Sequence, residues 1–191
     1  MAQKTIAALA VAVAATGGTL MPAASQAQVA YNVGAVTDYR YRGISQTRLK
    51  PALQGGVDYA AGAFYVGAWA STIKWIKDAG GGADVELDLY GGYKGEFSKG
   101  LGYDVGVLAY IYPGHDLQVS PQTTEIYGAL SYGPATLKYS HSVTNLFGFD
   151  DSKGSGYIDL AATFEITDGW MITPHIGRQT VKNLGEASYT D

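Results

Sequence analysis

The sequence contains no cysteine, and it has only three histidines. The absence of cysteine excludes disulfide bonds, thiolate metal ligands and cysteine nucleophiles. Charged residues are also scarce, at 16% of the chain, and acids outnumber bases to give a formal net charge of −4. Phosphate binding usually needs a clustered basic excess, so we expect no nucleic-acid partner.

The sequence also lacks an apolar run long enough for a membrane-spanning helix, which needs about 20 residues. The run Ile6–Ala15 is shorter; Lys4 precedes it, and small residues follow up to Ala27. A basic start, a short apolar run and a small-residue exit form the usual order of a secretory signal peptide. The sequence therefore predicts a signal peptide over residues 1–27 and an exported chain beginning at Gln28. The alternative for this segment is a buried N-terminal helix.

Glycine and tyrosine are abundant instead, with 26 and 15 residues, and together they favour strands and turns over helices. Apolar and polar residues alternate in segments of about ten residues, each followed by a cluster of turn-forming residues. This pattern predicts strands over residues 30–43, 52–59, 64–75, 84–97, 103–112, 124–132, 135–143, 157–166 and 170–181. Segment 64–75 has apolar residues on both faces, so its periodicity does not identify the polar face. Pro174 belongs at a strand end, an edge or a bulge, because it cannot donate to the ladder.

The connections between these segments are alternately long and short. The short ones are 60–63, 98–100, 133–134 and 167–169, and the long ones are 44–51, 76–84, 113–123 and 147–156. Tight turns at one end and longer loops at the other are typical of outer-membrane barrels. The sequence therefore predicts a single β-barrel domain over residues 28–191.

Alternation alone does not say whether the apolar face meets a core or lipid. A soluble sandwich buries that face, whereas a membrane barrel exposes it and keeps its polar face inside. The export signal, the glycine and alanine on the apolar faces, and tyrosines at their ends favour lipid contact. Those tyrosines are Tyr31, Tyr41, Tyr59, Tyr93, Tyr103 and Tyr132. We predict an all-β, antiparallel up-and-down transmembrane β-barrel in the outer membrane of a Gram-negative bacterium; a soluble periplasmic β-protein is the alternative.

Four stretches carry a family resemblance. They are VTDYRYRGISQT (36–47), KPALQGGVDY (50–59), YDVGVLAYIYPG (103–114) and TEIYGALSYGP (124–134). They are similar to the TorF family of proposed porins from proteobacteria, and the first stretch is the most specific. The resemblance implies an outer-membrane barrel with a channel role, surrounded by lipid and inserted by the barrel-assembly machinery.

The predicted strands do not make an even-numbered barrel. We count about nine complete strands and the start of a tenth, whereas an even number is expected. The resemblance implies a last strand ending in an aromatic residue, but the chain ends at Asp191. We therefore expect 9–10 strands of a complete set of about 12, with the C-terminal strands missing. The alternative is that one strand has been merged or missed.

The charged faces of the strands predict the lining of a lumen. In 30–43, alternation directs Tyr39 and Tyr41 to lipid and the charged residues inward. Nine acids then face inward against four bases, and acidic linings favour cations. We predict a channel for small polar solutes or ions with weak cation selectivity; the alternative is that these charges pair and plug the interior. The predicted lining residues are Asp38, Arg40, Arg42, Asp58, Glu86, Asp88, Lys94, Glu96, Asp104, Glu125, Lys138, Asp159 and Glu165.

No pattern in the sequence supports catalysis, a metal site or a cofactor. His115 and Asp116 are two adjacent polar residues in a loop, and a metal site needs three or four ligands. His141 and Ser142 are neighbours on a predicted strand, so they point to opposite faces. His175 has no partner that the sequence identifies. We therefore expect a protein that is not an enzyme, and the sequence leaves its oligomeric state open.

Overall fold

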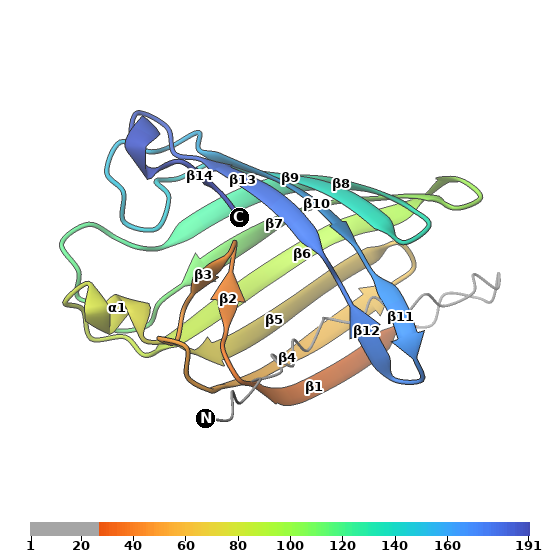
Figure 1. Ribbon diagram of the computed structural model, residues 1–191, viewed down its shortest axis with the longest axis horizontal. Coiled ribbons are helices and arrows are strands. Elements are labelled where there is room, and N and C mark those ends of the chain that lie inside the picture. The colour runs from red at the N-terminus through yellow and green to blue at the C-terminus, as the bar shows by residue number, and fades with distance from the viewer. Residues whose placement is uncertain (1–26) are drawn as a thin grey trace, which may run out of the picture.

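The computed structural model describes residues 27–191, and one large antiparallel sheet dominates it (Figure 1). The predicted signal peptide lies outside these residues, except for Ala27. The sheet has ten strands, and each is hydrogen-bonded to the next in the following order. They are β1 (Gln28–Val36), β4 (Ala52–Ala61), β5 (Phe64–Thr72), β6 (Val85–Ser98), β7 (Leu101–Ile111), β8 (Thr123–Tyr132), β9 (Ala135–Ser142), β10 (Gly156–Ala162), β13 (His175–Thr180) and β14 (Tyr189–Thr190).

Two hairpins and two short helical segments complete the fold. The hairpins are β2 (Arg40–Tyr41) with β3 (Ile44–Ser45), and β11 (Phe164–Thr167) with β12 (Trp170–Ile172). The helical segments are α1 (Trp75–Asp78) and the 3-10 turn η1 (Gly185–Ala187). Within residues 27–191, no helix is both long enough and apolar enough to cross a membrane.

The predicted all-β, antiparallel architecture is confirmed. Strands that follow one another along the main sheet pair as neighbours, so the chain runs up and down across it. The sheet is strongly curved and has a concave side (Figure 1). Its edges are β1 and β14, and in the part of the chain that the structure describes no pairing between them closes it into a barrel.

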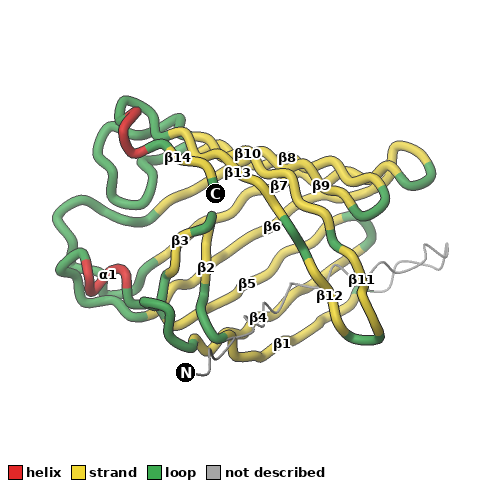
Figure 2. Tube along the Cα trace, in the orientation of Figure 1, coloured by secondary structure: helices red, strands yellow, loops and turns green. Residues whose placement is uncertain are grey.

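The connections follow the predicted alternation (Figure 2). Short turns join β4 to β5, β6 to β7, β8 to β9 and β11 to β12. Long segments join β1 to β4, β5 to β6, β7 to β8, β9 to β10 and β13 to β14, and they gather at the opposite end. We refer to these as the turn end and the loop end.

The prediction of one strand over residues 30–43 is wrong, because β1 ends at Val36. The Asp38 carboxylate accepts hydrogen bonds from the hydroxyls of Ser45 and Thr47, at 2.5 and 3.1 Å. Gly43 lies one residue beyond Arg42, which follows the end of β2 at Tyr41, and it adopts a φ of +74°, a conformation that glycine permits. Local bonding therefore folds this segment back into the β2–β3 hairpin.

Two other predicted strands are each divided. The segment 157–166 becomes β10 and β11, and 170–181 becomes β12 and β13. The second break lies at Pro174, which has no N–H to donate. The Pro174 carbonyl still accepts a hydrogen bond from the Ala162 amide at 3.0 Å, so the two strand pairs stay connected through this bend.

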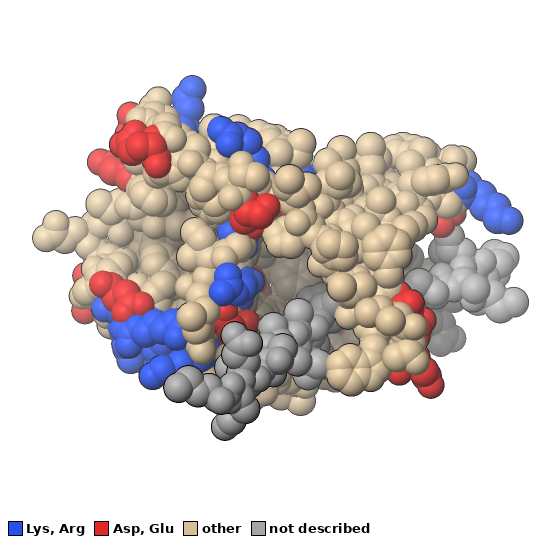
Figure 3. Space-filling view, in the orientation of Figure 1, with Lys and Arg blue, Asp and Glu red and all other residues tan. Residues whose placement is uncertain are grey.

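The two faces of the sheet differ sharply in polarity. The convex face exposes an apolar residue on nearly every strand, including Val33, Val57, Val66, Leu89, Val107, Ile126, Leu130, Leu137, Leu160 and Ile176. The concave side buries polar residues, including Ser71, Glu86, Asp88, Glu125, Ser140, Ser142 and Gln179. On the side seen in Figure 3, charged residues gather mostly at the two ends and beside the opening between the sheet edges.

The buried apolar cluster lies at the loop end. Its members are Ile73, Ile76, Ala83, Tyr110 and Tyr112, and Tyr39, Tyr41, Trp75, Leu108, Leu117 and Phe147 pack against it. These residues come from the hairpin segment, α1 and the long loops as well as from the sheet. The loop end of the concave side is therefore packed with side chains.

Candidate functional site

The β2–β3 hairpin lies against the concave side of the sheet and defines the candidate site. Its ladder pairs Arg40 with Ser45 and Tyr41 with Ile44. The exposed Arg40 guanidinium donates to the Gly43 carbonyl at 2.9 Å. Arg42, between the two strands, has a φ of +46°, a strained value for a residue with a long side chain. Such strain persists only where the surroundings hold it in place.

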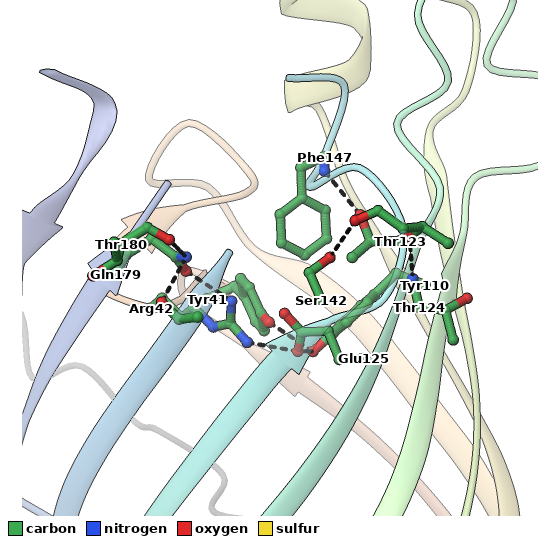
Figure 4. A network of polar contacts seen from close by, with 12 residues as sticks. Tyr41, Arg42, Tyr110, Thr123, Thr124, Glu125, Ser142, Phe147, Gln179 and Thr180 are labelled. Atoms are coloured by element: carbon green, nitrogen blue, oxygen red, sulfur yellow. Dashed lines mark hydrogen bonds and ion pairs between the residues drawn. The ribbon is translucent and has the colours of Figure 1, made fainter. Parts of the chain in front are cut away.

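Arg42 has those surroundings (Figure 4). Its Nη2 donates to Oε2 of Glu125 on β8, and its Nη1 donates to Oε1 of Gln179 on β13, both at 2.7 Å. The guanidinium lies between the rings of Tyr41 and Tyr157, 4.8 and 4.5 Å from their centroids. The side chains of Arg42 and Glu125 are only 6% and 2% exposed. One hairpin residue thus bridges two distant strands of the curved sheet.

Arg42 is buried as a charged group, because arginine stays protonated in proteins. Burial alone lowers the pKa of its guanidinium, but Tyr41 and Glu125 offset this and leave the pKa raised. A buried charge of this kind is tolerated because it is paired and hydrogen-bonded. The ion pair therefore anchors the hairpin only while both partners remain.

Two tyrosines of the hairpin segment also point inward. The Tyr39 hydroxyl donates to Oε1 of Glu86 on β6, and the Tyr41 hydroxyl lies 2.6 Å from that of Tyr110 on β7. Burial, followed by Glu86, raises the Tyr39 pKa, and burial with Tyr110 raises the pKa of Tyr41. The prediction that Tyr39 and Tyr41 face lipid is therefore wrong. The chain leaves the sheet after β1 and turns into the hairpin, so the inward and outward alternation of β1 does not extend to Tyr39 and Tyr41.

Tyrosine–carboxylate pairs continue along the concave side toward the turn end. The Tyr90 hydroxyl donates to Asp58 at 2.6 Å, and the Tyr65 hydroxyl donates to Asp104 at 2.6 Å. Tyr65 is also hydrogen-bonded to Tyr127, whose ring has Lys138 Nζ 4.1 Å from its centroid. These pairs connect β4 to β6, and β5 to β7 and β8.

Glycines on neighbouring strands make room for these rings. A Cβ on Gly67 would lie 2.6 Å from the ring of Tyr90, and one on Gly106 would lie 2.5 Å from the Tyr127 hydroxyl. Both distances are too short for a real side chain. These two glycines therefore serve the packing of the concave side.

The predicted lining residues fall into several groups. Seven contact the hairpin or the tyrosine pairs: Arg42, Asp58, Glu86, Lys94, Asp104, Glu125 and Lys138. Asp88 is buried on the same side, and among the described residues its Oδ1 has no hydrogen-bond partner. Asp159 Oδ1 lies 3.0 Å from His175 Nδ1. Asp38 and Arg40 pair within the hairpin segment, and Glu96 and Glu165 are exposed on strands near the turn end.

Among the described residues, no ion pair joins the hairpin arginines to Asp58, Glu86 or Asp88. Arg42 bonds Glu125 instead, and Arg40 stays local with Asp38, 2.9 Å away. The partners that we missed are uncharged: Tyr65, Tyr90, Tyr110, Tyr127, Tyr157 and Gln179. Several of them alternate in step with the charged residues of the same strand, so the sequence already placed them on the same face.

The histidines take part in local contacts. His115 Nδ1 accepts a hydrogen bond from the Leu117 amide at 3.1 Å. In the part of the chain that the structure describes, no group of His, Asp and Glu has the arrangement of a metal site.

Comparisons with known proteins give one family. No curated protein and no solved structure matches the chain. The resemblance to TorF porins has no support from these comparisons and stays a prediction. Residues 21–191, most of the chain, match a family described as a bacterial protein of unknown function, Gcw_chp. The chain therefore belongs to the Gcw_chp family.

Proposed function

We propose that this protein resides in the outer membrane as a β-barrel whose narrow, acid-rich interior is held shut by the β2–β3 hairpin. The observation that carries the proposal is the inverted polarity of the sheet. Its apolar residues are exposed on the convex face, and three acids, Glu86, Asp88 and Glu125, are buried on the concave one. A folded protein in water does not leave so extensive an apolar surface uncovered, whereas lipid covers it without cost.

The strand lengths fit a bilayer. Strands β4, β7 and β8 have 10, 11 and 10 residues. A tilted strand needs about 9–11 residues to cross the hydrocarbon layer. β6 is longer, with 14 residues, and extends with β7 past the end of β5 at the turn end.

Aromatic residues form a band on the convex face near the turn end. Phe64 contacts Tyr93 with 4.8 Å between ring centroids, and Tyr103 lies 6.1 Å from Tyr93 and 4.5 Å from Phe97. Aromatic girdles of this kind occur where a membrane barrel meets the headgroup layer. The band therefore supports a membrane boundary near the turn end.

The edges of the sheet set a condition on this proposal. β1 and β14 have no partner strand on their outer sides in residues 27–191. Unpaired backbone groups are costly in lipid, where no water satisfies them. We therefore expect these edges to be paired in the membrane.

The interior favours cations but is obstructed. Acids outnumber bases along it, and acidic linings attract cations. The hairpin, however, fills the loop end of the concave side through Tyr39, Tyr41 and Arg42. Conduction then requires the hairpin to move, whereas a permanently fixed hairpin makes the protein a closed structural or binding barrel, the second candidate.

Membrane insertion is tested by adding refolded protein to liposomes and separating them by flotation. We expect the protein to float with the vesicles and to migrate faster on a gel before heating than after it. Protein that stays at the bottom of the gradient contradicts the membrane proposal.

Channel function is tested in planar bilayers with the wild type and Arg42→Gln. We expect small or rare currents from the wild type, larger currents from the variant, and a reversal potential in a salt gradient that shows cation preference. Arg40→Gln, which removes an exposed charge of the same hairpin, is the control. If neither the wild type nor Arg42→Gln passes current, the closed barrel is supported. Anion preference contradicts the acidic pathway.

A further inference from the structure

A pocket of about 380 Å³ opens at the loop end, on the side of the hairpin that faces the long loops. The hairpin, α1, the loop after β9 and the segment around β14 contribute its walls. Six aromatic residues line it: Tyr41, Trp75, Tyr112, Phe147, Phe149 and Tyr189. Its size is in the range of pockets that bind small molecules.

The polar groups of the pocket are few. Of the described residues that line the pocket, Arg42 alone is charged, and Gln46 and Gln179 contribute side-chain amides. No carboxylate forms part of the lining, although Glu125 bonds Arg42 from the sheet side. A mostly apolar pocket with a few polar groups that fix orientation is the usual form of a ligand site.

Arg42 retains capacity to bind a further acceptor. A guanidinium has five N–H donors in a planar fork. The structure shows two hydrogen bonds to protein acceptors, one to Glu125 and one to Gln179. The remaining donors suit a carboxylate, which arginine binds in fixed geometry.

The pocket is held in shape by bonds between its walls. The Asn183 side chain donates to the carbonyl and carboxylate of Asp151, both at 3.0 Å, which joins the segment after β13 to the loop after β9. The Phe147 amide donates to the Thr123 hydroxyl at 2.8 Å. A pre-formed pocket binds with less loss of conformational entropy than one that must be ordered.

We propose that this pocket binds a compact, flat apolar molecule that carries one carboxylate. The ring system lies among the aromatic side chains, and the carboxylate accepts hydrogen bonds from Arg42 and the side-chain amide of Gln46. The proposal concerns the loop end only and does not depend on membrane insertion or conduction.

Isothermal titration calorimetry of the full chain in detergent micelles tests the proposal, with cinnamate as the probe and cinnamyl alcohol as its neutral counterpart. Heats from micelles alone are subtracted. We expect one cinnamate per chain, bound at least about tenfold more tightly than the alcohol, since hydrogen bonds to a charged group are the stronger ones. Absence of cinnamate binding, or equal affinity for both probes, overturns the proposal.

Two variants locate the binding. Phe149→Ala removes a half-exposed ring of the pocket and should weaken cinnamate about fivefold or more, because the ring no longer buries apolar surface of the probe. Phe64→Ala removes an exposed ring on the convex face and should leave affinity unchanged. Binding that falls in Phe64→Ala and not in Phe149→Ala places the probe outside the pocket and also overturns the proposal.

Discussion

Nη2 of Arg42 lies 2.7 Å from Oε2 of Glu125, although 83 positions separate the two residues. The pair joins the tip of the β2–β3 hairpin to β8, the sixth strand in the order of the main sheet. Arg42 also reaches Gln179 on β13, so one side chain contacts two strands of the sheet that have β9 and β10 between them. The contact fixes the hairpin against the concave side.

Loss of one partner of this pair should destabilise the fold strongly. Arg42→Gln leaves Glu125 buried without its counter-charge, and breaking a buried pair from one side costs about 3–5 kcal/mol. Glu125→Gln should have a similar effect, and the double variant should lose less than the sum of the two. Urea unfolding in detergent micelles, followed by tryptophan fluorescence, measures these free energies.

Arg40→Gln is the matched control. The Arg40 side chain is 56% exposed, and surface pairs contribute about 0–1 kcal/mol. If Arg42→Gln destabilises the protein no more than Arg40→Gln does, the anchoring role of Arg42 is wrong.

Two valines of similar exposure distinguish lipid from water around the sheet. Val107, on the convex face of β7, is 43% exposed, and Val119, in the long segment after β7, is 39% exposed. Arginine at a lipid-facing strand position costs about 2–4 kcal/mol near the middle of the bilayer. Val107→Arg should therefore reduce folding into liposomes, measured by heat-modifiable migration, while Val119→Arg should fold normally. Equal yields from the two variants would argue for a water-exposed convex face.

Alanine substitution should be far less tolerated at Gly43 than at Gly114, which has the same backbone conformation. Gly43 and Gly114 have φ values of +74° and +73°. Alanine costs about 1 kcal/mol at either position through that conformation. At Gly43 a new Cβ would also overlap Asp191 Cβ, whereas nothing lies within 4 Å of a Cβ on Gly114.

Asp191 is not free to move aside, because its amide and carbonyl bond those of Gly177 at 3.0 and 3.1 Å. We expect Gly43→Ala to lose about 1–3 kcal/mol more than Gly114→Ala, as overpacked sites do. Thermal or urea unfolding of the two variants measures the difference. Equal losses would show that the hairpin tip and the end of the chain are not in contact.

The hairpin tyrosines should make the fold sensitive to alkaline pH. The pKa of Tyr39 and of Tyr41 is raised in the folded protein, mainly by burial. The unfolded chain therefore loses these protons first, near the ordinary tyrosine pKa of about 10. The stability that they contribute is complete below that pH and decreases as the pH rises above it.

Ultraviolet absorbance of tyrosinate during an alkaline titration measures this effect. Tyr39→Phe and Tyr41→Phe should remove residues that ionise late, together with unfolding, and leave the early transition of exposed tyrosines unchanged. If the variants instead reduce the early transition, the two hydroxyls are not buried.

Much of the fold was predictable because strand periodicity is local. Alternation along 84–97 identified the inward face of β6, including Glu86 and Asp88, and the turn residues separated the strands. For β5 both faces carry apolar residues, so periodicity did not decide its orientation. The structure directs Trp69 and Ser71 inward, where Ser71 is buried and Trp69 contacts Tyr39 with 5.4 Å between ring centroids.

The hairpin was not predictable in the same way. Residues 37–43 continue the alternation of β1, so a straight strand satisfied the sequence pattern. The bonds of Asp38 to Ser45 and Thr47, together with the positive φ of Gly43, turn the chain inward. These contacts compete with a longer ladder against β4, and alternation does not register that competition.

The sequence by itself determined the antiparallel sheet, its two unlike faces and the long and short connections. These depend on the two-residue period of a strand and on local turn chemistry. Only the tertiary structure decided that Arg42 pairs with Glu125, that Tyr39 and Tyr41 lie inside, and that a pocket forms at the loop end. These contacts join residues from distant strands, and the curvature of the sheet, which no local pattern specifies, brings them together.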